Sequence, residues 1–381
     1  MITFNRPYAT GREFGYIREA IENRHLSGNG PFAGRCAAWL EERIGCGRAF
    51  LTGSGTAALE MAAMLAGVGP GDEVIMPSFT FVTTASSVAM RGATPVFVDI
   101  RPDTLNLDET RIEAAITPRT RAIMPVHYAG VGCAMDPIME LAAAHGLVVV
   151  EDAAQGLMST YGGRPLGGFG QAACLSFHET KNVVCGEGGA LLTNDDSWIE
   201  RAEILQEKGT NRTSFFRGEV DKYTWVELGS SFLMSEVNAA FLWAQLEAAE
   251  RITESRLRVW KSYHARFAGL EEQGLVRRPV VPDEASHNGH MYYLLLPDRS
   301  SRDALIRSLA ERDIQAVFHY VPLHSSPAGR RYGRADAELP VTDDASGRLV
   351  RLPLWADMED RGVDLVASAV EAAVGARVPA Q

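Results

Sequence analysis

Short apolar segments alternate with amphipathic ones between about residues 49 and 195. Amphipathic segments such as Ala57–Ala66 and Met135–His145 predict helices. The apolar segments predict seven strands: Ala49–Thr52, Val74–Ser78, Thr94–Asp99, Arg121–His127, Leu147–Asp152, Ala172–Phe177 and Gly189–Asn194. Segments such as LVVVED are apolar throughout, which is typical of parallel strands covered on both faces. The pattern therefore predicts an α/β domain with a mainly parallel seven-stranded sheet.

A second region follows this domain. The helical pattern from Ser235 to about Leu270 predicts one long helix that links two domains. Beyond it, the apolar segments MYYLLL and QAVFHY, a helix at Arg302–Arg312 and a C-terminal helix predict a smaller α+β domain. We expect a large domain over residues 1–235, and the linking helix with the small domain over residues 236–381.

Composition and charge narrow the function classes. The 381 residues carry 37 Lys and Arg against 48 Asp and Glu, a formal net charge of −11 that argues against a general nucleic-acid or anionic-membrane binder. Five cysteines without a C-x-x-C pair indicate neither a disulfide framework nor a zinc site. The N-terminal segment lacks the apolar core of a signal peptide, and no segment suggests a membrane span. We expect a cytoplasmic protein without a bound metal.

The segment TGSGTAALEMA at positions 52–62 matches G-x-G-x-x-A between a predicted strand and a predicted helix. A dinucleotide site would place an acidic residue at the end of the next strand, whereas Asp72 and Glu73 precede that strand. An NAD-dependent oxidoreductase using this loop therefore stays the alternative. The favoured interpretation is that Ser54, Gly55 and Thr56 form a phosphate site at a helix N-terminus, against the simpler one of a capped turn.

Two further segments complete a possible cofactor site. VVVEDAAQG places Glu151 and Asp152 at the carboxyl end of a buried strand, where they either bind a ligand or cap a turn. HETKN is not a zinc-protease motif because Asn182 replaces its second histidine, but it presents Lys181 in a loop before the glycine-rich GEGG. A lysine for a Schiff base, a phosphate site and a carboxylate for a pyridinium nitrogen together predict a pyridoxal phosphate enzyme.

The chain also resembles the DegT/DnrJ/EryC1/StrS family of sugar-nucleotide aminotransferases nearly end to end. The likeness lies in GDEVIMPSFTFVTTA, FVDIRPDTLNLD, MPVHYAG, VVEDAAQG, LSFHETKN, GEGGALLTND and FHYVPLH. It implies the fold type I architecture of aspartate aminotransferase. It also implies that Lys181 forms the Schiff base, that Asp152 pairs with the pyridine nitrogen, that Gln155 contacts the ring hydroxyl and that Phe81 stacks on the ring. At the phosphate it implies Gly55, Thr56 and Ser176.

The resemblance implies transfer of an amino group from L-glutamate to the 4-keto carbon of dTDP-4-dehydro-6-deoxy-D-glucose, which gives dTDP-4-amino-4,6-dideoxy-D-galactose. The product would serve surface glycans such as lipopolysaccharide or enterobacterial common antigen. A 3-aminotransferase on a dTDP-3-keto-6-deoxyhexose is an alternative, and so is a non-catalytic sensor that uses the same pocket. Dehydratases of the family carry histidine in place of Lys181, so the resemblance favours an aminotransferase over a sugar dehydratase. A homodimer with interface active sites is also implied, and Ser231 stands where many members carry an asparagine that reaches the neighbouring subunit's phosphate.

Two segments are candidates for contact with the substrate. KGTNRTSFFR contains Lys208, Arg212 and Arg217 without a carboxylate among them, and arginines suit a diphosphate. With the resemblance added, contact with a nucleotide sugar is favoured over a solvated loop. FHYVPLH contains His319 and Tyr320, in the region where the small domain of the family closes over the site. A packed histidine without a role is the equally weighted alternative for His319.

Overall fold

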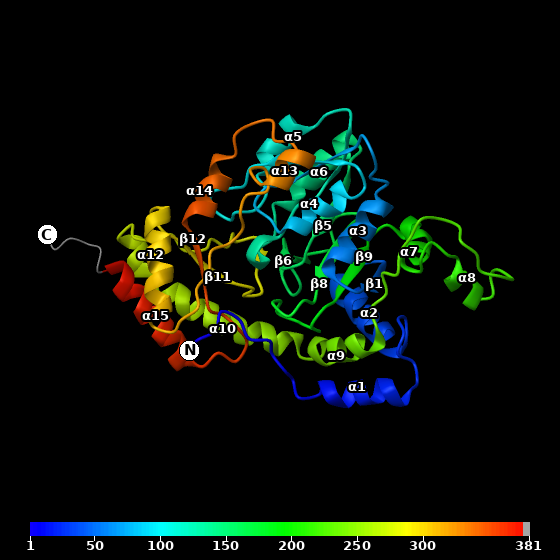
Figure 1. Cartoon of the computed structure of the whole chain (residues 1–381), viewed down its shortest axis with the longest axis horizontal. Coiled ribbons are helices and arrows are strands. Elements are labelled where there is room, and N and C mark those ends of the chain that lie inside the picture. The colour runs from blue at the N-terminus through cyan, green and yellow to red at the C-terminus, as the bar shows by residue number, and fades with distance from the viewer. Residues whose placement is uncertain (376–381) are drawn as a thin grey trace.

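A central sheet of seven short strands organises the computed structural model, which describes residues 1–375 (Figure 1). In spatial order the strands are β1 (Arg48–Thr52), β9 (Gly189–Thr193), β8 (Ala172–Ser176), β5 (Val148–Asp152), β4 (Thr120–Ile123), β2 (Glu73–Pro77) and β3 (Thr94–Val98). The run from β8 to β3 is parallel, whereas β9 is antiparallel to both of its neighbours. The predicted seven-stranded, mainly parallel sheet is confirmed.

Helices cover both faces of this sheet, and this explains why its strands are apolar throughout. On β5, Val150 packs with the helices of one face and Val149 with those of the other. The first face carries α3 (Gly55–Leu65), α4 (Val82–Ala89) and α7 (Ile199–Gln206). The second carries α2 (Pro31–Ile44), α5 (Ile112–Ala115), α6 (Met135–His145) and α9 (Glu236–Leu246), with α1 (Glu13–Glu22) packed on α9.

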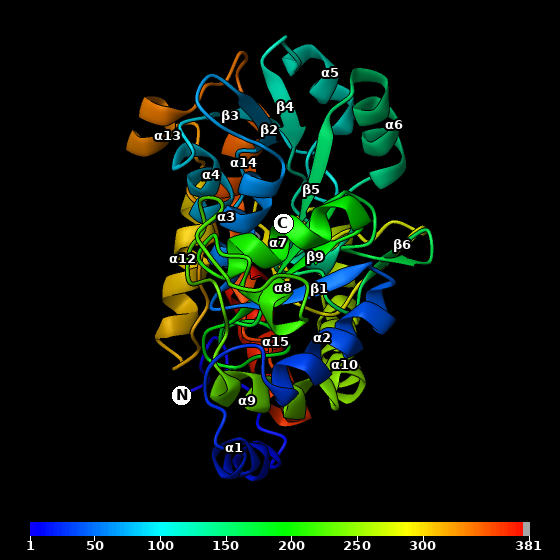
Figure 2. The same ribbon diagram turned by 90° about the vertical axis from the view of Figure 1, so that its right-hand side faces the viewer.

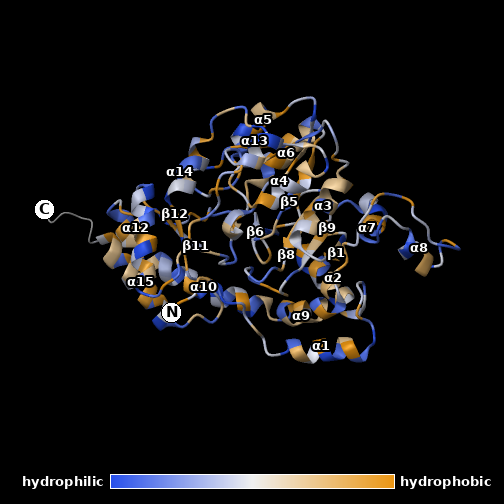
Figure 3. Cartoon of the chain, in the orientation of Figure 1, coloured by the Kyte–Doolittle hydropathy of each residue, from blue (hydrophilic) through white to orange (hydrophobic). Residues whose placement is uncertain are grey.

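A smaller α+β part lies beside the sheet and has its own apolar core (Figure 1). Its strands β11 (Tyr292–Leu295) and β12 (Leu349–Leu352) pair antiparallel. Its helices are α10 (Ala249–Arg266), α11 (Ala268–Glu272), α12 (Arg299–Ala310) and α15 (Asp360–Gly375). Along α12 and α15 hydrophilic and hydrophobic positions mix, as expected of helices that cover a core with one face (Figure 3).

The remaining elements are short. A three-stranded sheet joins β10 (Ala285–Ser286), β6 (Thr160–Tyr161) and β7 (Arg164–Pro165). The other helices are α8 (Arg212–Phe216), α13 (Pro327–Tyr332), α14 (Pro340–Arg348) and the 3₁₀ turns η1 (Glu109–Arg111), η2 (Tyr128–Gly130) and η3 (Asp196–Trp198). Within residues 1–375, no helix combines the length and apolarity that crossing a bilayer requires.

The prediction of one long helix from Ser235 to about Leu270 is wrong. The chain leaves helical geometry at Ala248, whose N–H bonds three residues back to the Gln245 carbonyl at 3.1 Å. A second break separates α10 from α11. The first break allows α9 to pack on α1 and α2 while α10 packs on α15 in the smaller part. The packing of two separate cores therefore determines where the helix ends.

Two predicted strands are shorter than expected. The segment Arg121–His127 keeps strand geometry only to Ile123, because Pro125 has no N–H to continue the ladder. Its carbonyl still accepts from Asp152 N–H at 2.9 Å, so the chain stays beside β5. QAVFHY forms no extended strand and pairs with β12 only through Val317 and Arg351.

The domain boundary at residue 235 stays a prediction, and one later segment crosses it. Arg334 pairs with Val96 on β3 at the sheet edge, and its guanidinium contacts Glu73 at 2.8 Å. Farther on, Thr342 N–H donates to Asp99 at 2.8 Å. The chain around α13 and α14 thus returns to the large sheet before β12 enters the smaller part.

Candidate active site

A cavity of about 630 Å³ lies at the carboxyl ends of β5 and β8 and is walled by both parts of the chain. Ligands of open α/β sheets bind at this end of the strands. The predicted residues that line it are Ser54, Gly55, Thr56, Phe81, Asp152, Gln155, Ser176, Lys181, His319 and Tyr320. The predicted residues that do not line it are Lys208, Arg212, Arg217 and Ser231.

The N-terminus of α3 forms one end of the cavity. Ser54 caps the helix by accepting the Ala57 N–H at 3.1 Å, so the capped-turn interpretation is correct as far as it goes. The same turn faces the cavity, where a helix N-terminus favours an anion. A Cβ at Gly55 would lie 2.9 Å from Ser176 Cβ, so only glycine lets the end of β8 approach this closely.

Asp152 brings a buried carboxylate to the cavity from the end of β5. One carboxylate oxygen accepts the Thr84 hydroxyl at 2.7 Å, and the other accepts the Ala154 N–H at 3.2 Å. Asp152 therefore both caps the following turn and offers a negative charge to a ligand. Thr84 bonds in turn to the Thr80 hydroxyl at 2.9 Å. The role of Thr84 was not predicted, and its only sequence signal is its place in the quoted segment MPSFTFVTTA.

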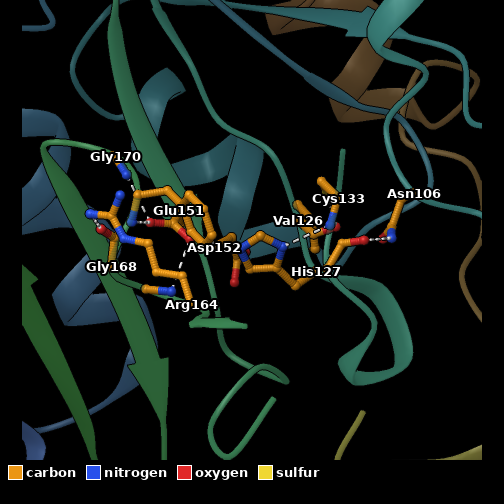
Figure 4. Close-up of polar contacts among 12 residues, drawn as sticks. Asn106, Val126, His127, Cys133, Glu151, Asp152, Arg164, Gly168 and Gly170 are labelled. Carbon is orange, nitrogen blue, oxygen red and sulfur yellow. Dashed lines mark hydrogen bonds and ion pairs between the residues drawn. The ribbon is translucent and has the colours of Figure 1, made fainter. Parts of the chain in front are cut away.

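The neighbouring acid, Glu151, has a purely structural role (Figure 4). Successive strand residues point to opposite faces, so Glu151 turns away from Asp152. Its carboxylate accepts the N–H groups of Gly167, Phe169 and Gly170, at 2.9, 2.7 and 2.9 Å, and His127 Nε2 at 2.9 Å. The interpretation that both acids cap the same turn is wrong for Glu151, which holds the loop before β8 in place.

Lys181 lies in the loop between β8 and β9 and lines the cavity. Burial lowers the pKa of its ammonium group to about 8; Asp152 opposes this shift, and Arg351 adds to it. At pH 7, a pKa near 8 leaves roughly a tenth of the amine neutral, compared with well under a thousandth at the ordinary value. The neutral amine is the nucleophilic form, so the site activates this lysine.

A polar network fixes the loop that carries Lys181. Asn182 donates from Nδ2 to the Asn288 carbonyl at 2.9 Å, and its Oδ1 lies 2.9 Å from His290 Nδ1. The Asn288 side chain donates to the carbonyls of Gln155 and Leu157, both at 2.7 Å. The asparagine that replaces the zinc-protease histidine thus joins the lysine loop to the chain that enters the smaller part. Neither Asn288 nor His290 was predicted.

Aromatic and amide side chains form another part of the cavity wall. Gln155 accepts the Ala129 N–H at 2.7 Å and donates to the Tyr320 hydroxyl at 3.0 Å. Tyr320 stacks on His319, with ring centres 3.6 Å apart, and His319 Nδ1 lies 2.8 Å from the Tyr128 hydroxyl. Burial and the nearby charges lower the pKa of His319 well below its ordinary value, so the ring is neutral. Contact of His319 and Tyr320 with substrate stays a prediction.

The predicted diphosphate-binding stretch lies on the segment around α8, which stands away from the sheet (Figures 1 and 2). We call this segment the arm. Carboxylates from outside the stretch pair with its cations. Lys208 and Arg212 lie 3.4 and 3.7 Å from Glu207, and Arg217 lies 2.8 Å from Glu203. The stretch is therefore not an unneutralised patch within its own chain. Its binding of a nucleotide sugar stays a prediction that would require a second subunit.

Ser231 occupies a similar place. It is exposed and pairs through its backbone with Glu207 on the same arm. A contact with phosphate would again have to reach the cavity of another subunit, and it also stays a prediction.

Residues distant in sequence complete the cavity. The segment at Phe4 and Asn5 lines it, and Asn5 donates to the Glu179 carbonyl at 3.2 Å. Arg256 is buried and donates to the carbonyls of Gly289 and His290, at 3.1 and 2.6 Å. Arg351 on β12 also lines the cavity. No motif signals these residues, because each reaches the cavity only through the tertiary fold.

The residues present fit pyridoxal phosphate. One cavity holds an amine of lowered pKa, a carboxylate at a strand end and a helix N-terminus that a Cβ at Gly55 would disrupt. Lys181, Asp152 and the Ser54–Thr56 turn would hold the group. These correspond to the reactive carbon, the ring nitrogen and the phosphate that such a cofactor presents.

Comparisons with known proteins agree with this assignment. The family described as DegT/DnrJ/EryC1/StrS aminotransferase matches residues 7–371. Spore coat polysaccharide biosynthesis protein SpsC of Bacillus subtilis is 34% identical, over 97% of this chain and 96% of the relative. GDP-perosamine synthase of Caulobacter vibrioides is 35% identical, over 97% of both chains. The aminotransferase TlmJ from Streptoalloteichus hindustanus has a TM-score of 0.90 at 31% identity over the whole of both chains, and similar solved structures include a PLP form.

Proposed function

Because the chain belongs to the DegT/DnrJ/EryC1/StrS aminotransferase family, we propose that it transfers the amino group of L-glutamate to the 4-keto carbon of dTDP-4-dehydro-6-deoxy-D-glucose. The chain is a pyridoxal phosphate-dependent sugar aminotransferase. The observation that carries the proposal is the amine of Lys181, activated by burial, in one cavity with the carboxylate of Asp152. The NAD-dependent alternative is set aside, because the GSGTAA loop belongs to an aminotransferase.

Two residues of this chain perform the chemistry. When bound, the cofactor supplies a carbonyl carbon that captures amines and a ring that accepts electrons. Lys181 would hold that carbon, and its amine, when free, would act as the base that takes a proton from the donor's α-carbon. Asp152, fixed by Thr84 and the Ala154 N–H, stabilises a positive charge on the ring nitrogen. A lysine serves both tasks because its pKa of about 8 allows it to gain and lose a proton near neutrality.

The sugar and its nucleotide belong to the proposal. The resemblance of this chain to its family supports the 4-keto position and dTDP. The Caulobacter relative, in contrast, is named for a GDP-linked sugar. A role in surface glycan synthesis is supported by the Bacillus relative, which is named for polysaccharide biosynthesis. The 3-keto sugar stays the second candidate, since the position of attack depends on how the sugar lies against the cofactor.

A homodimer is also part of the proposal. Phe81 lines the cavity, yet 56% of its surface is exposed in a single chain. The arm around α8 presents exposed aromatic side chains, among them Phe216 and Trp225, at 70% and 72%. Exposed apolar groups of this size are typical of surfaces that another chain covers. A second copy that covers Phe81 would also bring the cations of an arm near a cavity.

An amino-transfer assay with a panel of sugars tests the function. Purified enzyme is incubated with L-glutamate and 4-keto or 3-keto 6-deoxy sugars linked to dTDP, UDP or GDP. We expect release of 2-oxoglutarate with the dTDP-linked 4-keto sugar and a 4-amino product identified by NMR. Lys181→Ala removes both the product and the visible absorption band of the bound cofactor, whereas Lys261→Ala on the exposed face of α10 retains both. A wild-type protein that is colourless and never releases 2-oxoglutarate would refute the proposal.

A further inference from the structure

His290 presents a free ring nitrogen to the cavity that contains Lys181. The residue is buried just before β11 and lines this cavity. Its Nδ1 lies 2.9 Å from Asn182 Oδ1. Its Nε2 bonds to no other group among residues 1–375, and it is not sealed beneath other atoms either. Since the ring lines the cavity, this nitrogen is open to a group that enters the cavity.

The hydrogen bonds around His290 fix the position of its proton. Asn182 donates from Nδ2 to the Asn288 carbonyl at 2.9 Å, so its Oδ1 is the acceptor that faces His290. An acceptor pairs with a donor, and His290 Nδ1 therefore carries the proton. Burial and the positive charge of Lys181, followed by those of two arginines, lower the pKa of His290 well below its ordinary value, so the ring is neutral. Nε2 is then a hydrogen-bond acceptor.

The amine of Lys181 lacks such an acceptor. With a pKa of about 8, most of it is protonated at pH 7, and an ammonium group has three N–H donors. Asp152 and Arg351 act on this group through their charge and not through a hydrogen bond. Asp152 is already engaged by Thr84 and the Ala154 N–H. A charge removed from water is costly unless it is hydrogen-bonded, so an acceptor within reach would stabilise the ammonium.

We propose that His290 Nε2 accepts a hydrogen bond from the amine of Lys181 whenever that amine is free. This inference rests on the proposed function, in which Lys181 both holds the cofactor and moves a proton. His290 is bonded to Asn182, the residue next to Lys181, and both His290 and Lys181 line one cavity. The lysine side chain is a flexible four-carbon stem that can swing to this nitrogen. His290 would thus hold the free amine in place and act as a positioning residue.

Other groups of the cavity are less suited to this role. Glu187 also lines the cavity, but 67% of its side chain is exposed, and its carboxylate lies 3.7 Å from His178 Nε2. The Nδ1 of His319 faces a tyrosine hydroxyl, which can donate or accept, so the proton position of this ring is not fixed. Gln155 uses its side-chain oxygen for the Ala129 N–H. His290 is the neutral acceptor whose proton position the fold determines.

The free amine of Lys181 is also subject to the other titratable groups around it. Those that line the cavity with it are, in chain order, Asp152, His178, Glu187, Arg256, His290, His319, Tyr320 and Arg351. Asp152 raises the pKa of the lysine, whereas Arg351 lowers it. An acceptor at His290 would add to the effect of Asp152, because a hydrogen bond to the ammonium form favours that form. Loss of this acceptor should therefore lower the pKa of Lys181.

Two substitutions separate the two nitrogens of the ring. In His290→Asn the amide NH₂ takes the place of Nδ1–H, so the bond to Asn182 is kept and the acceptor at Nε2 is lost. In His290→Gln the longer side chain brings an oxygen to the position of Nε2 and gives up the bond to Asn182. His287→Asn is the matched control. His287 lies three residues away, contacts Trp260 with ring centres 4.4 Å apart and does not line the cavity.

The pKa of Lys181 is measured in the full-length apoprotein, from the rate at which acetic anhydride modifies its amine across a range of pH. Peptide mass spectrometry follows Lys181, and the exposed Lys261 is the internal reference. In His290→Asn we expect the midpoint for Lys181 to fall by about one pH unit, with Tm close to that of the wild type. His290→Gln should restore the midpoint and lower Tm, because Asn182 then loses its donor. His287→Asn should leave the midpoint unchanged.

An unchanged midpoint in a folded His290→Asn protein would overturn the proposal. An equal shift in both substitutions of His290 would overturn it too, because that result indicates a structural effect alone. The wild type gives a readout that needs no substitution: ¹⁵N NMR of the histidine rings should show the proton of His290 on Nδ1. A proton on Nε2 would contradict the proposed contact.

The holoenzyme supplies an independent readout. In the 2-oxoglutarate assay, kcat of His290→Asn should fall about 10-fold or more, with KM for L-glutamate unchanged, because a misplaced amine slows proton transfer and does not weaken donor binding. A higher KM with an unchanged midpoint would assign Nε2 to the donor and overturn the proposal. Because the labelling requires no turnover, a wild type that never releases 2-oxoglutarate refutes the proposed function alone. Normal turnover by a His290→Asn protein with an unchanged midpoint refutes the His290 contact alone.

Discussion

Glu151→Gln measures how strongly the buried carboxylate behind the active site stabilises the fold. The four hydrogen bonds to this side chain occupy both oxygens, two donors to each (Figure 4). A glutamine keeps one oxygen and places an NH₂ group against the two donors on the other side. His127 cannot compensate by moving its proton to Nδ1, because that nitrogen accepts the Cys133 N–H at 3.1 Å.

Two buried donors are therefore left without an acceptor. Each unsatisfied donor costs about 1–3 kcal/mol, so the free energy of unfolding should fall by about 2–6 kcal/mol. For a domain of roughly 200 residues this corresponds to a decrease in Tm of about 5–15 °C. The matched control is Glu113→Gln, because Glu113 is exposed and lies 3.9 Å from His145 at the surface. That change should alter stability by less than about 1 kcal/mol.

The pH dependence of this difference is a second readout of the same variant. Burial raises the pKa of Glu151, but the hydrogen bonds from His127 and the backbone outweigh it, so the net pKa is lowered. A lowered pKa means that the carboxylate stabilises the fold above its ordinary pKa of about 4.3 and loses this effect as the pH falls through the folded value. The wild type and Glu151→Gln should therefore converge in acid. Thermal unfolding followed by circular dichroism between pH 7 and 3 measures both effects, because the loss lies below about pH 4.3. Equal stability at pH 7, or a difference that grows in acid, would refute the reasoning.

Three further predictions concern the cavity. The rate at which pyridoxal phosphate attaches to apoprotein, followed by absorbance, should rise with pH and reach a plateau above about pH 8, where Lys181 is neutral. Asp152→Asn should shift the midpoint of this rise to lower pH, because Asp152 raises the pKa of that lysine. Thr84→Val removes the 2.7 Å hydrogen bond to Asp152, and kcat should fall by about 10-fold or more in the 2-oxoglutarate assay while the protein stays folded. Gly55→Ala should weaken cofactor binding in a fluorescence titration, whereas Gly53→Ala, whose Cβ would meet nothing closer than 3.9 Å, should leave it intact.

The sheet was predictable because its strands have a distinct chemical pattern. β5 is apolar on both faces, and Val149 and Val150 each reach a separate helix layer. The bounds of α6 were predicted correctly because Gly146, with φ of 63°, ends the helix where the pattern stops. The break at Ala248 has no such signal, since neither proline nor glycine interrupts the helical period there. It depends on which core each half of the segment joins, and this is a property of the tertiary structure.

In the candidate site, too, some residues have a signal in the sequence and others are recognised only in the tertiary structure. Lys181, Asp152 and Gly55 were predictable because strand ends and helix starts are visible in the sequence, and the topology of a parallel sheet brings them together. Asn182 was recognised only for what it excludes, although its amide fixes the lysine loop. No local pattern marks Arg351, because the groups around it, Phe4 and the Phe318 carbonyl, belong to other segments of the chain.

The large sheet and the smaller part of the chain supply different residues of the cavity wall. The groups proposed to hold the cofactor follow strands β1, β5 and β8 of the large sheet, and this sheet brings them to one cavity. Other residues of the cavity wall come from the N-terminal segment, β12 and the chain around His319, and these are brought together only when the smaller part packs against the sheet. A ligand that contacts residues of both groups would therefore bridge the two parts. Its binding should stabilise their packing, because a ligand stabilises the arrangement to which it binds.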